Sequence, residues 1–235
     1  MSLPLENRNI AILHPDLGIG GAEQLIINIG LALKNKGANV FMYTPRYDPN
    51  RCFEDSKLLH IEIVGSMFPR SIFGRCLALC AYIRMMLWAI HVALFAGGFD
   101  WIILDQVSFP IPLLRLFNRN VIFYCHFPDK LLWVERTSLL KKIYRFFLDT
   151  IEELTTGLAH RILVNSKFTS QIFSDSFRLL SIQPDILYPC IKEDAFNTFS
   201  SQSKKSIDNL YKLLDLDSSA PMPRIITSLN RYERK

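Results

Sequence analysis

The sequence carries few of the marks of a secreted protein. Residues 1–8 are polar and contain no apolar core of a signal peptide. No Asn-x-Ser/Thr acceptor occurs in the 235 residues, and the five cysteines form no C-x-x-C pair. An odd number of scattered cysteines indicates free thiols rather than a disulfide framework. These absences favour a reducing, cytosolic compartment.

Long hydrophobic runs and clustered basic residues are also missing. The most apolar segment, 72–99, is interrupted by Arg75 and Arg84, and its uninterrupted part, 85–96, is shorter than the ~20 residues that span a bilayer. We expect a helix that either packs in the core or lies in a membrane interface, and the mean hydropathy of +0.16 keeps membrane contact open. A net charge of +5 suits anionic ligands or lipids, whereas nucleic acid is not expected because no basic block is interleaved with aromatic residues.

One loop near the N-terminus has the clearest chemical pattern. Residues 14–23, HPDLGIGGAE, follow an apolar run over 10–13 and precede an amphipathic run that ends near Asn35. This order predicts a strand, a glycine loop and a helix. Gly18, Gly20 and Gly21 would let backbone N–H groups approach an anion at the helix N-terminus. The plain alternative is that these glycines serve only the turn.

The same loop fits a nicotinamide dinucleotide poorly. Glu23 occupies the position of the third glycine in the G-x-G-x-x-G pattern. The second predicted strand, 40–44, ends in Pro45 and Arg46, without the acidic residue that would hold a ribose. An oxidoreductase is therefore only a minor alternative.

Strand and helix patterns alternate along the chain, which predicts an α/β fold with a Rossmann-like parallel sheet covered on both faces. The pattern favours one domain over 1–192, a polar linker over 193–222, and the start of a second, truncated domain over 223–235. Further strands are predicted at 60–64, 100–105, 120–124, 161–165 and 185–188, and helices at 22–35 and 138–159 and from Ser166 onward.

Several strings together resemble the family 4 glycosyltransferases, and among them the mannosyltransferases that build the dolichol-linked oligosaccharide of asparagine-linked glycosylation. The carriers are 14–23, 47–49, 105–108, 123–129 (FYCHFPD), 151–157, 162–166 and 230–235 (NRYERK). The resemblance implies the two-domain GT-B architecture. In that case 1–192 is the N-terminal, acceptor-side domain, and 223–235 begins a truncated donor-binding domain.

The resemblance also implies an activity. It is the retaining transfer of mannose from GDP-mannose, in alpha-1,3 and/or alpha-1,6 linkage, to a Man1GlcNAc2-type glycan on dolichyl pyrophosphate. The implied location is the cytosolic face of the endoplasmic reticulum membrane, with membrane lipid and other glycosyltransferases of the pathway as partners. No metal ion and no cofactor besides the GDP-mannose donor substrate is implied. The alternative is a non-catalytic, membrane-associated truncated form that binds lipid or partner transferases.

The resemblance assigns roles to particular residues. His126 matches a histidine near the transferred sugar and is the predicted catalytic residue. Gly18, Gly20 and Gly21 would contact the donor diphosphate or sugar, with Arg231 and Lys235 as the matching basic pair. Asp105 and Asp129 are either acceptor-side carboxylates or loop caps, and both readings stay open.

Three other features have a plainer interpretation. Asp215-Leu216-Asp217 spells a metal-dependent D-x-D motif, but it lies in the predicted linker and is read as accidental. Lys141, Lys142 and Arg145 form either a solvated helix face or a patch attracted to anionic headgroups. His14 is expected to pack beside the glycine loop.

Overall fold

The computed structural model describes residues 5–69, 71–72, 76–117, 120–132 and 139–190, all within a first compact unit, Met1–Cys190. The predicted linker 193–222 and the predicted second-domain start 223–235 lie outside the described residues. Arg231, Lys235 and the motif at 215–217 fall in that part of the chain, so their predicted roles stay predictions.

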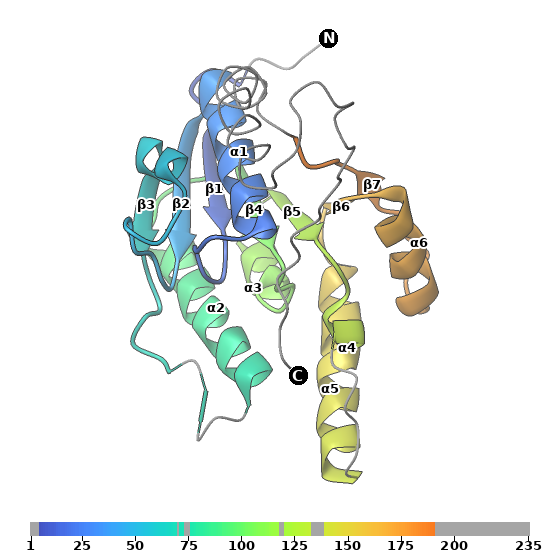
Figure 1. The fold of residues 1–235 in the computed structure, drawn as a ribbon. Helices are drawn as coiled ribbons and strands as arrows, with labels where there is room; N and C mark the ends of the chain where they lie inside the picture. Colours follow the sequence, from blue (N-terminus) through green and yellow to red (C-terminus); the bar gives the residue numbers. More distant parts are fainter. Residues whose placement is uncertain (1–4, 70, 73–75, 118–119, 133–138, 191–235) are drawn as a thin grey trace, which may run out of the picture. The chain divides into compact units, whose positions relative to one another are not determined.

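The described residues form a parallel sheet of seven strands in the order β3-β2-β1-β4-β5-β6-β7, as Figure 1 shows. The α/β class with a Rossmann-like parallel sheet is thereby confirmed. The strand order reverses between β1 and β4, where open α/β sheets bind their ligands. The strands are β1 (Asn9–Leu13), β2 (Asn39–Thr44), β3 (His60–Ile63), β4 (Trp101–Asp105), β5 (Asn120–Cys125), β6 (Arg161–Val164) and β7 (Asp185–Ile186).

Helices cover both faces of the sheet, because successive strand residues point to opposite sides. In β1, Ile10 and Ile12 pack in one buried cluster with Ile26 of α1. Ala11 and Leu13 belong to the opposite cluster, which includes side chains of α2, α3 and α6. The helices are α1 (Gly21–Asn35), the short 3-10 helix η1 (Glu54–Leu58), α2 (Leu77–Leu94), α3 (Ile111–Leu116), α4 (Asp129–Leu132), α5 (Leu139–Thr156) and α6 (Lys167–Ser176).

The apolar segment around α2 packs against the sheet. Trp88 is buried and meets Tyr43 of β2 edge to face, with ring centroids 5.8 Å apart. Met85 and Val92 are buried on the same side, which confirms the core-helix alternative. Phe95, just after α2, is 75% exposed. Among the helices that the structure describes, none combines the length and apolarity needed to cross a membrane.

One surface prediction was wrong. Arg145 of α5 is buried, with Nη2 2.8 Å from Asp149 Oδ1 one helical turn away and Nη1 3.3 Å from Asp129 Oδ2. Two carboxylates draw this guanidinium inward, so it belongs neither to a solvated face nor to a headgroup-binding patch. Lys142 is exposed, as expected.

Candidate functional site

Three strands bring the candidate site together at the carboxyl edge of the sheet. In the registers, Leu13 of β1 pairs with Leu104 of β4, and Asp105 pairs with Tyr124 of β5. Residues at the carboxyl ends of these strands therefore converge at the point where the strand order reverses. They are His14, after β1, and His126, after β5, on either side of Asp105.

The Asp105 carboxylate lies between the two histidines. His14 Nδ1 is 2.5 Å from Asp105 Oδ2, and His126 Nε2 is 2.9 Å from Asp105 Oδ1. The second contact is close but not aligned as a hydrogen bond. The side chains of Asp105 and His14 are 0% and 1% exposed, whereas that of His126 is 19% exposed. Of the three, His126 alone has an accessible ring surface, so a ligand at this edge would meet it first.

The environment keeps Asp105 ionised. Burial pushes the pKa of its carboxyl upward, but the contacts with His126 and His14 outweigh burial and hold the pKa below its ordinary value. An anionic carboxylate orients an imidazole that it contacts and stabilises positive charge on it. Because Asp105 is inaccessible, we expect it to act through the two rings rather than on an acceptor.

The residue after Asp105 adopts an unusual backbone conformation. Gln106 has φ 62°. The Val107 N–H, one residue after Gln106, donates to the carbonyl of Asp105, one residue before it, at 2.8 Å. This hydrogen bond closes a three-residue turn of the rare type with a positive central φ. Backbone strain of this kind concentrates at functional sites. This conformation could not be predicted from the sequence, since glutamine is not a residue that favours the positive-φ region.

The glycine loop leads directly into α1, as predicted. Gly20 precedes the helix without a side-chain cap, so no side chain of this residue covers the first N–H groups of α1. Among the described residues, an added Cβ would meet nothing within 4 Å at Gly18 or Gly21, and neither residue has a positive φ. At Gly20 its three nearest neighbours would be atoms at the flexible end of Glu23. The part of the chain that the structure describes therefore gives no reason for glycine at Gly18 or Gly21, whereas a ligand lying against the backbone would.

Asp129 belongs to a second polar cluster. It begins α4, pairs with Arg145 and donates its N–H to the Glu152 carboxylate. Its side chain is 40% exposed, so both an acceptor contact and a capping role remain predictions. We did not anticipate the part that Glu152 plays in this cluster. The spacing of Arg145 and Asp149, at i and i+4 of one helix, was a signal that these two side chains pair.

No group of three or more His, Cys, Asp or Glu side chains suited to a metal ion occurs in the part of the chain that the structure describes. The expectation of a metal-free reaction stays a prediction. Basic groups and N–H donors can stabilise a leaving diphosphate without a metal ion.

Comparisons with known proteins agree on one family. Residues 19–194 match the family model described as Glycosyltransferase Family 4. Three curated relatives carry the name Alpha-1,3/1,6-mannosyltransferase ALG2. The relative from Dictyostelium discoideum is 48% identical over 97% of this chain and 55% of its own length. That from Homo sapiens is 43% identical over 97% and 53%. That from Saccharomyces cerevisiae is 38% identical over 98% and 45%.

This chain spans about half the length of the curated relatives that it matches. Among solved structures, a sucrose-phosphate synthase from Thermosynechococcus elongatus aligns with a TM-score of 0.56 at 18% identity, over 79% of this chain and 49% of that one. That likeness concerns the fold alone, and it agrees with the Rossmann-like sheet.

Proposed function

The chain belongs to glycosyltransferase family 4, and from this premise we propose that it forms the acceptor-side half of a retaining mannosyltransferase. The donor is GDP-mannose, and the acceptor is a Man1GlcNAc2-type glycan on dolichyl pyrophosphate, extended in alpha-1,3 and/or alpha-1,6 linkage. The observation that carries the proposal is the His14–Asp105–His126 cluster beside the uncapped start of α1, in a chain 48% identical to a mannosyltransferase.

The site chemistry supports this reaction class. When mannose leaves GDP, negative charge grows on the diphosphate, and N–H groups aimed at that charge stabilise the transition state more than the ground state. The glycine loop and the first turn of α1 offer such N–H groups. His126, oriented by Asp105, would lie beside the transferred sugar, and Arg231 and Lys235 would hold the diphosphate.

Cells provide a test of the proposed activity. We define the chimera as a protein in which this chain replaces the part of the D. discoideum relative that it matches. In S. cerevisiae depleted of its own relative, we expect the chimera to restore lipid-linked glycans larger than Man1GlcNAc2, read by mass. If cells with the chimera accumulate Man1GlcNAc2 while parallel cells with the intact D. discoideum relative are rescued, the proposal is contradicted.

The glycine loop yields a prediction that separates ligand binding from stability. In the chimera, Gly21→Ala should leave the thermal midpoint unchanged or raise it, because the new methyl meets no atom of the described residues and alanine favours helix. Transfer from GDP-mannose should fall about tenfold, since ~1.4 kcal/mol of lost donor contact has that effect. Initial rates at several donor concentrations measure the loss of donor binding, and a melting curve measures the change in stability. Unchanged rates would mean that the glycine serves only the turn.

We further propose that the protein works at the cytosolic face of the endoplasmic reticulum membrane, in contact with lipid and near other glycosyltransferases of the pathway. The support is a stripe of exposed apolar side chains along α5 and the turn that follows it, at i, i+4, i+11 and i+15 from Ile143, with Phe147 61% exposed. The stripe consists of Ile143, Phe147, Leu154 and Leu158. Lys142, exposed on the same helix, suits anionic headgroups.

Membrane contact can be measured by co-sedimentation of this chain with vesicles of endoplasmic reticulum lipid composition. We expect the chain to pellet with the vesicles, and Phe147→Ser to weaken vesicle binding about tenfold or more, since burying a phenylalanine contributes about 1.5–3 kcal/mol. Leu116→Ser, at an 82% exposed site on α3, is the matched control and should not change binding. If both variants lose vesicle binding equally, α5 is not the part of the chain that contacts the membrane.

A further inference from the structure

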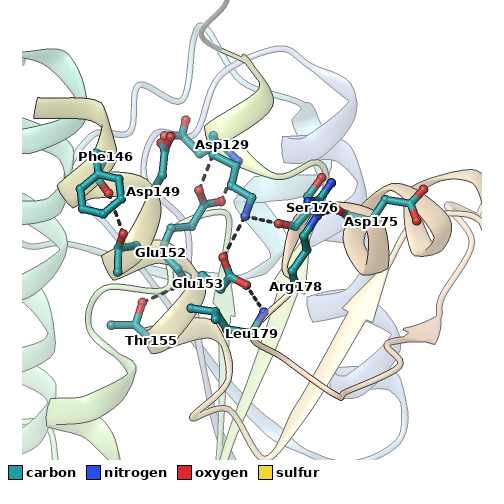
Figure 2. Close-up of polar contacts among 12 residues, drawn as sticks. Asp129, Phe146, Asp149, Glu152, Glu153, Thr155, Asp175, Ser176, Arg178 and Leu179 are labelled. Carbon is teal, nitrogen blue, oxygen red and sulfur yellow. Dashed lines mark hydrogen bonds and ion pairs between the residues drawn. The ribbon is translucent and has the colours of Figure 1, made fainter. Parts of the chain in front are cut away.

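Glu152 of α5 is a buried carboxylate that accepts hydrogen bonds from two backbone groups. Its Oε1 accepts the N–H of Asp129 at 2.7 Å, and its Oε2 accepts the N–H of Lys130 at 2.9 Å. Figure 2 shows the side chain directed at the start of α4, away from its neighbour Glu153. These two bonds tie α5 to the segment that follows β5.

The two N–H groups open a short helix. The first N–H groups of any helix have no carbonyl partner within it. In α4 the Leu131 N–H reaches the Pro128 carbonyl at 3.1 Å, and Glu152 satisfies the two before it. Hydrogen bonds to a carboxylate are about twice as strong as those between neutral groups. A residue distant in sequence therefore sets where α4 begins.

The surroundings of Glu152 disfavour the charged form of its carboxyl group. Burial, with a smaller contribution from the Asp129 carboxylate, raises the pKa of its carboxyl to about 7, although the two N–H bonds act in the opposite direction. Glutamine would avoid the buried charge, but it offers one acceptor oxygen, and its NH₂ would face the second N–H group. Of these two side chains, only the carboxylate can hold both backbone groups.

The segment fixed in this way carries His126. Asp129 lies three residues after His126, and between them runs the short loop from β5 to α4. The other end of the loop is fixed by Asn165, whose Nδ2 donates to the His126 carbonyl at 3.1 Å. Arg145 adds a bond from Nη2 to the Asp129 carbonyl at 3.3 Å. The imidazole 2.9 Å from Asp105 thus belongs to a loop that hydrogen bonds hold at both ends.

We propose that Glu152 is a positioning residue of the candidate site, which holds the first turn of α4 and thereby sets the place of the His126 imidazole against Asp105. The inference rests on the proposed function only for the reaction that His126 serves. The geometric part can be tested in this chain without any activity.

Glu153 provides a matched control. It is adjacent, similarly buried and also ionisable, but its Oε1 accepts the Leu179 N–H at 2.6 Å, beyond α6, and its Oε2 accepts the Lys130 side chain at 3.0 Å. Figure 2 shows the Glu153 carboxylate directed at the Leu179 N–H. Glu153→Gln therefore makes the same chemical change without removing a backbone bond of α4.

The experiment is NMR on the 235-residue chain with labelled histidine and backbone amides. In Glu152→Gln we expect amide exchange at Asp129 and Lys130 to accelerate about 10-fold to 100-fold, the loss expected for a bond to a charged group. The ring signals of His126 should shift or broaden. In Glu153→Gln, exchange should accelerate at Leu179 instead, and the His126 signals should keep their wild-type positions.

Two results would overturn the proposal: release of the α4 amides with unchanged His126 signals, or equal shifts in both variants. If Glu152→Gln does not fold, Glu152→Asp keeps the charge but shortens the reach, and it should produce the same His126 shift. In the chimera, Glu152→Gln should lower kcat about tenfold with the KM for GDP-mannose unchanged. A chimera without any activity would count against the proposed function and leave the NMR result standing.

Discussion

Replacing His126 with alanine should lower mannose transfer by the chimera about 100-fold or more without unfolding the protein. The ring is the partly exposed member of a cluster at the carboxyl edge of the sheet, 2.9 Å from an ionised Asp105. A positioned histidine that moves a proton or stabilises developing charge contributes about 10²–10⁴-fold. Losing the ring removes this contribution and also its contact with Tyr124, whose ring centroid lies 4.8 Å away, so the folding of the variant is checked alongside its rate.

The measurement is the initial rate of hexose addition to a lipid-linked Man1GlcNAc2 acceptor, compared with a melting curve of the same sample. His60→Ala is the control, since His60 begins β3, pairs with Glu62 and lies 60% exposed, away from the strand ends that form the site. It should transfer mannose at the wild-type rate. If His126→Ala also keeps the wild-type rate, His126 has no part in the mechanism.

Replacing Asp105 with alanine should have the largest effect on stability. The substitution leaves two histidines at a site where the carboxylate was 0% exposed and contacted both. Removing one partner of a buried charged pair costs about 3–5 kcal/mol. For a chain of this size each kcal/mol lowers the melting temperature by about 2–4 °C, so the midpoint should fall by roughly 10 °C. Calorimetry of the 235-residue chain measures this directly.

The pH dependence of that loss has a definite sign. Contacts with the histidines lower the pKa of folded Asp105, so the unfolded chain takes up its proton first as the pH falls. The stability that Asp105 contributes is therefore complete above its ordinary pKa near 3.8 and is lost as the pH falls through the lower, folded value. The difference in unfolding free energy between wild type and Asp105→Asn should therefore shrink as the pH falls below about 4. A difference that grows on acidification would contradict this reading of the cluster.

Much of the sheet was predictable because its signal is local. Each buried parallel strand is a short apolar run bounded by turn residues, and six predicted strands lie within a few residues of β2 to β7. The glycine loop and α1 followed from the same reasoning. The short helices η1, α3 and α4 were missed because four to six residues carry no usable periodicity.

The site was predictable only in part, because its contacts join distant strands. His126 was identified from the FYCHFPD string, but its partner depends on β4 lying between β1 and β5. That order also explains His14, which we expected merely to pack beside the glycine loop and which instead contacts Asp105. Arg145 was misjudged because two carboxylates, one of them on α4, turn it inward.

The most direct test of the account is product formation by the purified chimera. The purified chimera is incubated with a synthetic lipid-linked Man1GlcNAc2 acceptor and either GDP-mannose or UDP-glucose, and the mass of the product is measured by mass spectrometry. We predict a gain of one or two hexoses with GDP-mannose, none with UDP-glucose, and almost none when His126 is alanine. A gain from UDP-glucose alone, or no gain while the intact D. discoideum relative is active in parallel, would contradict the assignment.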